Sequence, residues 1–225
     1  MRFPQVLKYS TSILFLCLCA QAQTPPAKDT PSTEAKGLPL RANPTDYQAQ
    51  AKAGTVTLGA EFMRHAVNTP QGEFSAEEYV VVEVGLFGAA GERLKVSTAD
   101  FSLRINGKKA ALPGQPFGVI FATLKDPNWE PPEPVGGAKP KGGAIKTGGD
   151  EKGEGGAPPA PVHMPVPLRH AMEQKVQKAA LPEGDRALPL AGLLFFYYRN
   201  KSTSIQSVEL LYSGPAGKAT LDLQP

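Results

Sequence analysis

Residues 193–198 read Leu-Leu-Phe-Phe-Tyr-Tyr, and this stretch decides the fold. Successive side chains of a β-strand point to opposite faces, so the odd-numbered residues share one face and the even-numbered residues share the other. Both faces are then apolar and both require cover. We therefore expect a strand in the middle of a sheet, between two neighbouring strands and with a layer on each side.

Further strand patterns lie on both sides of this stretch. Residues 54–62 alternate between apolar and polar, which is typical of a half-buried antiparallel strand. Residues 78–87 form a longer β-branched run, in which residues 80, 82, 84 and 86 face inward and Glu83 faces the other side. Asn106-Gly107, between residues 101–105 and 108–112, predicts a hairpin with a type I′ turn. Residues 205–212 and 219–223 add two strands joined by a tight Gly-Pro turn.

One helix is predicted over residues 167–181, bounded by Pro167 at its start and by Pro182 and Gly184 after its end. Its apolar stripe at helical spacing consists of Leu168, Ala171, Met172, Val176, Ala179 and Ala180. We expect it to pack across an open end of the strands. About eight short strands with one helix predict an all-β fold, an immunoglobulin-like antiparallel β-sandwich.

Residues 1–22 have the features of a signal peptide. Arg2 and Lys8 precede an apolar run over residues 11–20, and residues 20–22 read Ala-Gln-Ala, a small-x-small cleavage pattern. The run is too short to span a bilayer, which takes about 20 apolar residues. We expect cleavage near Ala22 and a periplasmic or secreted protein. A lipoprotein is the alternative, since Cys17 and Cys19 lie in the run, but both follow Leu and not a small residue.

Cleavage would leave a chain without cysteine, which excludes disulfide and thiolate chemistry. It would also remove Arg2 and Lys8, so that 22 of the 24 basic residues face 21 acidic ones, a formal net charge of +1. This balance predicts no nucleic-acid partner. No transmembrane segment is expected after cleavage.

Three ranges complete the predicted organisation. Residues 23–53 have few large apolar side chains and are predicted to be a flexible tether. Residues 54–225 are predicted to be the β-sandwich domain. Within it, residues 127–161 hold 8 Pro and 9 Gly among 35 residues, well above the roughly 25–30% that indicates disorder. We interpret this stretch as a disordered insertion on the surface of the domain.

Four stretches carry a family resemblance. Residues 79–84 read YVVVEV, residues 96–104 VSTADFSLR, residues 190–196 LAGLLFF, and residues 209–212 ELLY. In this order they resemble secreted bacterial immunoglobulin-like domains of unknown function, which are often lipoproteins or envelope accessories. The resemblance covers residues 55–223 without the insertion and implies a β-sandwich with no catalytic motif. The chain departs from that family in the insertion, in the helix, and in lacking a good lipid-attachment box.

Each candidate for chemistry has a simpler explanation. Lys146-Thr147-Gly148 is similar to a box of penicillin-binding enzymes, but the chain has no Ser-x-x-Lys and no Ser-Asp-Asn. The three histidines, His65, His163 and His170, lack the Cys or acidic partners that would complete a metal site, and a solvated surface role is the simpler explanation. Glu77 and Glu78 are adjacent on a strand, so they point to opposite faces and cannot share acid–base work.

Two features suggest binding. Tyr79, Trp129, Tyr197 and Tyr198 could stack on sugars, although aromatic residues in strands more often pack in the core or at its rim. Residues 129–134 could present a polyproline segment to a partner, although a spacer is the simpler interpretation. Asn200-Lys201-Ser202 fits a glycan acceptor, but we favour a hairpin turn over residues 199–204.

The sequence thus predicts an exported, non-enzymatic protein that binds or scaffolds a component of the cell envelope, with a protein or an envelope component as partner. We assign no catalytic, cofactor-binding or metal-binding residues and expect no cofactor. The alternatives are a carbohydrate-binding module and a hydrolase whose site shows no sequence motif.

Overall fold

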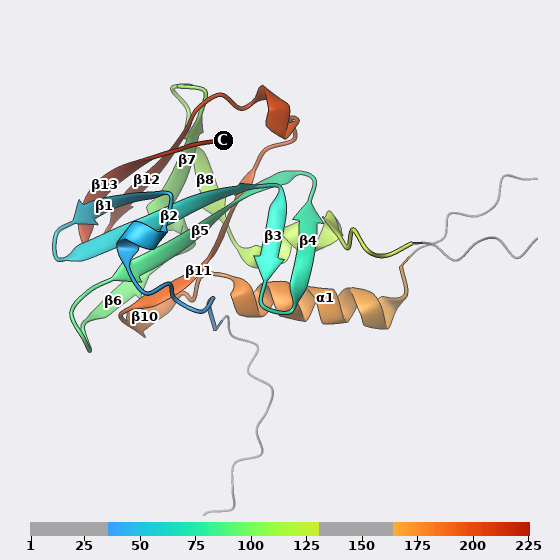
Figure 1. The fold of residues 1–225 in the computed structure, drawn as a ribbon, viewed down its shortest axis with the longest axis horizontal. Coiled ribbons are helices and arrows are strands. Elements are labelled where there is room, and N and C mark those ends of the chain that lie inside the picture. The colour runs from blue at the N-terminus through green and yellow to red at the C-terminus, as the bar shows by residue number, and fades with distance from the viewer. Residues whose placement is uncertain (1–35, 131–163) are drawn as a thin grey trace, which may run out of the picture. The chain divides into compact units, whose positions relative to one another are not determined.

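A computed structural model describes residues 36–130 and 164–225 (Figure 1). The predicted signal peptide, residues 23–35 of the predicted tether and residues 131–161 of the predicted insertion lie outside the described residues. In chain order the elements are η1 (Pro44–Asp46), β1 (Ala49–Ala53), β2 (Val56–Arg64), β3 (Ala66–Thr69), β4 (Gly72–Ala76), β5 (Tyr79–Phe87), β6 (Arg93–Val96), η2 (Thr98–Asp100), β7 (Phe101–Ile105), β8 (Leu112–Gln115), η3 (Phe117–Ala122), β9 (Leu124–Lys125), α1 (Val166–Ala179), β10 (Gly184–Ala187), β11 (Leu190–Tyr197), η4 (Ser202–Ser204), β12 (Val208–Gly214) and β13 (Gly217–Leu223).

Eight strands form the main sheet, in the order β1-β2-β5-β11-β8-β7-β12-β13, and all of its ladders are antiparallel. The edge strands β1 and β13 lie beside each other, so the sheet is nearly closed and barrel-like. Two small sheets, β6-β10 and β3-β4-β9, accompany it. The predicted all-β antiparallel fold with a single short helix is confirmed for the described residues. The immunoglobulin-like sandwich is not confirmed, because one continuous sheet joins all eight strands.

Strand β11 lies between β5 and β8, as its two apolar faces predict. Leu194 and Phe196 belong to an inner core, whereas Leu193 and Phe195 belong to a second cluster on the outer face. All four side chains are buried, and Tyr197 at the end of the strand is exposed. The prediction of a central strand covered on both faces is therefore confirmed.

The edge of β11 that faces β8 is completed by pieces of chain from elsewhere. Strand β8 reaches only residues 195 and 196, so the rest of that edge needs other hydrogen-bond partners. The Leu181 amide donates to the Leu193 carbonyl at 3.0 Å, and the Leu38 amide donates to the Ala191 carbonyl at 2.8 Å. Gly192 allows this approach, because a Cβ there would lie 2.4 Å from the Cα of Leu181.

The inner core joins β1, β2, β5 and β11 to β7, β12 and β13. The inward-facing residues predicted in 54–62 and 78–87 are all buried. Burying one Leu or Phe side chain stabilises the fold by about 1.5–3 kcal/mol, so this cluster is the main source of stability. Its largest fully buried members are Leu58, Leu86, Phe101, Leu103, Leu181, Leu194, Phe196, Leu210 and Leu221.

The helix covers the outer face of the main sheet and does not close an open end, which corrects the predicted position. Met172 and Val176 pack in one cluster with Val81 of β5, Phe195 of β11 and the small sheet β3-β4-β9. In Figure 1 the orange helix lies beneath β3 and β4. The outer apolar face of β11 requires this cover. Leu168, the first residue of the predicted apolar stripe, does not pack in this cluster and is 40% exposed.

Residues 36–53 differ from the predicted tether. Residues 49–53 form β1, which pairs with β2 over its whole length. Residues 36–48, here called the strap, run across the outer face of β11, β5 and β2. The segment has few apolar residues, and it is held instead by backbone pairing at Leu38, by the ion pairs of Arg41 and by the buried ring of Tyr47.

Two connections also differ from the predictions. Asn106 and Gly107 have φ of 54° and 63°, as a type I′ turn requires, but the following strand begins only at Leu112. Residues 108–111 therefore lie between the turn and the ladder. The loop that contains Asn200 joins β11 to β12, which are not neighbours, since β8 and β7 lie between them. It is a crossing connection and not a hairpin turn.

Candidate functional site

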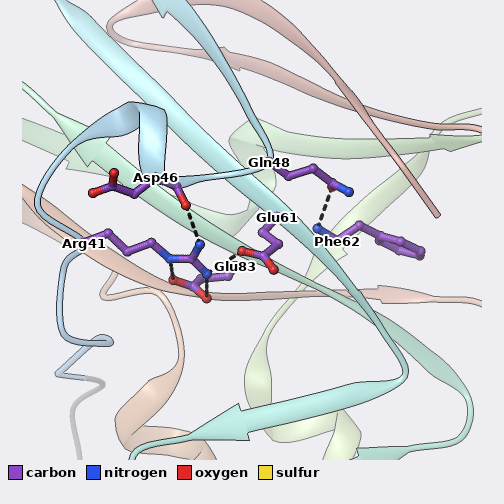
Figure 2. Close-up of polar contacts among 6 residues, drawn as sticks. All are labelled: Arg41, Asp46, Gln48, Glu61, Phe62 and Glu83. Atoms are coloured by element: carbon purple, nitrogen blue, oxygen red, sulfur yellow. Dashed lines mark hydrogen bonds and ion pairs between the residues drawn. The ribbon is translucent and has the colours of Figure 1, made fainter.

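A charged cluster lies on the outer face of β2 and β5, beneath the strap. Figure 2 shows the Arg41 guanidinium facing two carboxylates. Arg41 Nε donates to Glu83 Oε1 at 3.1 Å, and Arg41 Nη2 donates to Glu83 Oε2 at 2.8 Å. The same Nη2 lies 2.5 Å from Glu61 Oε2, while Nη1 donates to the Asp46 carbonyl at 2.7 Å. Arg41, Glu61 and Glu83 are here called the Arg41 cluster.

The register of the sheet explains why an arginine lies here. Glu61 and Glu83 are directly opposite each other on β2 and β5, and like charges in that position destabilise a sheet. Arg41 contacts both carboxylates and neutralises part of their repulsion. Burial of the guanidinium acts to lower the pKa of Arg41, but Glu83 and then Glu61 outweigh it, so that the pKa is raised.

Tyr47 packs beside the cluster in a trough made by two glycines. A Cβ at Gly59 would lie 2.5 Å from the Tyr47 ring, and a Cβ at Gly85 would lie 2.6 Å from its hydroxyl oxygen. The ring is buried, contacts Phe87 edge to face at 5.9 Å, and lies 4.5 Å from the Arg41 guanidinium carbon. Its hydroxyl has no hydrogen-bond partner in the described part of the chain. Burial, and then the charge of Glu83, raise the pKa of Tyr47.

The Arg41 cluster has the residue types of an acid–base pair, but its groups are already engaged with one another. A general base needs an accessible carboxylate within reach of a substrate proton, and only 12% of the Glu83 side chain is exposed. We interpret the cluster as a fastening for the strap. Sequence reasoning placed Glu83 on the outer face of its strand but did not connect it with Glu61 or Arg41. The available signal was a lone glutamate within a run of valines.

A surface pocket of about 460 Å³ lies between the end of β9 and the start of α1. Much of its lining is apolar, from Leu124, Trp129, Met164 and Met172. Lys125, Asp126 and Arg169 contribute charged groups. A pocket of this size and mixed lining is suited to binding a small molecule or a short peptide segment.

The structure brings together two of the four predicted stacking aromatics. Tyr79 and Tyr197 are opposite each other on β5 and β11, with ring centroids 5.5 Å apart in an edge-on arrangement. Arg199 donates to Glu78 at 2.6 Å and lies 5.8 Å from the Tyr197 ring. Trp129 lines the pocket. Tyr198 is buried in the inner core, on the other face of the strand.

The two histidines among the described residues, His65 and His170, serve local structure, and His65 is half-buried and not fully solvated as predicted. The Nδ1 atom of His65 lies 2.8 Å from the Tyr79 carbonyl oxygen and 3.2 Å from that of Ala76, which fixes the corner after β2. His170 pairs with Glu173 one turn along the helix at 3.0 Å. His163 and Lys146-Thr147-Gly148 lie outside the described residues.

The adjacent carboxylates Glu77 and Glu78 bind different cations, Lys125 and Arg199, each at 2.6 Å. They lie in the turn between β4 and β5 and not on a strand, so the predicted separation by opposite strand faces is wrong; what separates them is their different ion-pair partners. Within residues 36–130 and 164–225 no group of three or more His, Cys, Asp and Glu side chains is placed to hold a metal ion. Over the same residues, none of the helices is long and apolar enough to cross a membrane.

Comparisons with protein-family models, with curated proteins and with solved structures give no match to this chain.

Proposed function

We propose that the protein is an exported, non-enzymatic domain of the cell envelope that binds a partner through the pocket between β9 and α1. The observation that carries this proposal is the lining of the pocket, in which an aromatic ring and two thioethers lie beside charged groups. Thioether side chains adapt to differently shaped apolar partners. The carboxylates of the Arg41 cluster, in contrast, are engaged with the strap.

The proposed architecture is a sandwich of the immunoglobulin-like type, related to the secreted bacterial family that the sequence resembles. In support, within the described residues the hydrogen-bonded ladder between the strands β1-β2-β5-β11 and the strands β7-β12-β13 passes through β8, which pairs at only two positions with each neighbour. Side chains from both groups of strands meet in the inner core. Export rests on the pattern of residues 1–22.

The experiment is capture of partners from the native envelope by the tagged full-length protein. We expect Trp129→Ala to reduce the recovery of specific partners, because it removes the aromatic wall of the pocket. Tyr197→Ala is the matched control, since it removes an exposed aromatic ring elsewhere. Equal recovery by the wild type and by Trp129→Ala would refute the pocket as the binding site. Turnover of esterase, glycosidase or peptidase substrates by the purified protein would refute a non-enzymatic role.

A carbohydrate-binding module is the second candidate, and the paired Tyr79 and Tyr197 rings favour it. The side chain of Tyr197 is 44% exposed, and the Arg199–Glu78 pair beside it offers hydrogen-bonding groups to sugar hydroxyls. Retention on cell-wall polysaccharide matrices should then fall in Tyr197→Ala and persist in Trp129→Ala. Absence of retention on any such matrix would remove this candidate.

A further inference from the structure

We infer that the pocket between β9 and α1 takes an acidic peptide segment that carries a bulky apolar side chain, with Arg169 as the contact for the acidic group. This inference rests on the proposed function and names the chemistry of the partner. It follows from the charges around the pocket, from the start of the helix, and from the apolar side chains beside it.

Arg169 is the cation of the pocket most available to a ligand. The Lys125 ammonium is held by Glu77 at 2.6 Å, on the side of β4. Arg169 Nε lies 3.7 Å from Glu173 Oε1, and half of the Arg169 side chain is exposed. The Arg169–Glu173 pair is therefore loose. A planar guanidinium with this exposure can donate two parallel hydrogen bonds to a carboxylate of a ligand.

The single acidic group in the lining is turned to its own loop. Asp126 Oδ1 accepts the backbone N–H of Asn128 at 2.9 Å. This hydrogen bond orients the carboxylate toward the turn after β9 but does not remove its charge. The lining therefore carries two cations, Lys125 and Arg169, against one carboxylate, and Arg169 is the cation with the longer ion pair.

The start of α1 adds to the preference for an anion. The helix has 14 residues, its N-cap position is Pro165, and no side chain caps it. Its first turn carries no acidic residue, although an acidic residue there would offset the positive end of the helix dipole. An acidic segment from a partner would supply the missing negative charge.

The apolar half of the site accounts for the second part of the inference. Trp129, Met164 and Met172 line the pocket, and the same end of the helix exposes Val166 by 53% and Leu168 by 40%. Large apolar side chains exposed together are a mark of an interaction surface. A carboxylate alone would leave this surface in water, whereas a peptide with an adjacent Phe or Leu would cover it.

Trp129 is the only tryptophan of the chain, so its emission reports occupation of the pocket. The full-length protein would be titrated with acetyl-Glu-Phe-Leu-Glu-amide, with acetyl-Lys-Phe-Leu-Lys-amide as a charge-reversed control and with acetyl-Glu-Gly-Ser-Glu-amide as a control without apolar side chains. We expect a saturable blue shift with the first peptide. The two controls should bind roughly 10-fold more weakly or worse, the size of one charge-assisted contact or one buried side chain.

Arg169→Gln should lower the affinity for the first peptide by roughly 10-fold, so that the variant no longer prefers this peptide to the lysine peptide. Arg93→Gln, which removes an exposed arginine beside β10, should leave binding unchanged. Equal binding of the two charged peptides, or no effect of Arg169→Gln, overturns the inference. Binding of decanoate without binding of the peptide would overturn the inference in favour of a free amphiphile. Self-association of the protein that is lost in Arg169→Gln would overturn it in favour of a second copy of this chain.

The two proposals fail separately. If envelope capture depends on Trp129 while charge reversal has no effect, the inference falls and the proposed function stands. If Trp129→Ala leaves envelope capture unchanged, the proposed function is refuted, and with it the inference that rests on it.

Discussion

Replacing Arg41 by methionine tests how the strap is fastened to the sheet. The change keeps an unbranched side chain of similar length but leaves Glu61 and Glu83 opposite each other without a cation. Removing one partner of a buried ion pair costs about 3–5 kcal/mol. Because 12% of the Glu83 side chain and 34% of the Glu61 side chain remain exposed, we expect a loss of about 2–3 kcal/mol in the free energy of unfolding.

Urea unfolding followed by circular dichroism measures this loss. Arg93→Met is the matched control, because Arg93 and Asp185 are both more than half exposed and such pairs contribute about 0–1 kcal/mol. Adding Glu61→Gln and Glu83→Gln to Arg41→Met should recover more than half of the loss, since the repulsion disappears. A loss for Arg41→Met no larger than that of the control would refute the reasoning. No recovery in the triple variant would assign the loss to packing on Tyr47.

Three further predictions follow from local geometry. Tyr47→Phe removes a buried hydroxyl that has no hydrogen-bond partner among residues 36–130 and 164–225, so the free energy of unfolding measured in urea should stay unchanged or rise by up to about 1 kcal/mol. Burial raises the pKa of Tyr47, so the folded state holds the phenol proton more tightly than the unfolded state does. The wild type should therefore lose more stability than the variant as pH rises above 10.0. Gly192→Ala places a Cβ against backbone and should cost about 1–3 kcal/mol in the same assay, whereas Gly118→Ala, with open space around it, should cost less than about 0.5 kcal/mol. Hydrogen bonds, first the one from Thr55, lower the pKa of the Glu92 carboxyl. The contribution of Glu92 to stability is therefore present above pH 4.5 and is lost as pH falls below 4.5. In Thr55→Val an NMR titration should show a higher pKa for Glu92 than in the wild type.

The outer face of β5 shows what the alternation of apolar residues can and cannot predict. The alternation in residues 78–87 correctly separates an inner face from an outer one that contains Val81 and Glu83. Pattern does not say what covers the outer face. Along the strand the cover comes from the cluster around α1 at Val81, from Arg41 at Glu83 and from Tyr47 at Gly85. Two of these three come from a segment whose composition indicates a tether, because one ion cluster and one ring hold it in place of a run of apolar residues.

The pairing of Glu61 with Glu83 depends in the same way on the register between β2 and β5, since the residues are far apart in the chain and no local motif joins them. The pocket depends on the meeting of β9 with the start of α1, on either side of residues 131–163.

The sequence by itself determined the all-β class, the strands β2, β5, β7, β11, β12 and β13, the helix of the described residues and the central position of residues 193–198, because alternation and helical spacing are local properties of the chain. Only the tertiary structure decided the order of the strands, the place of α1, the fastening of the strap and the existence of the pocket. These features arise from contacts between segments distant in sequence, and their energies depend on register and burial that no single segment encodes.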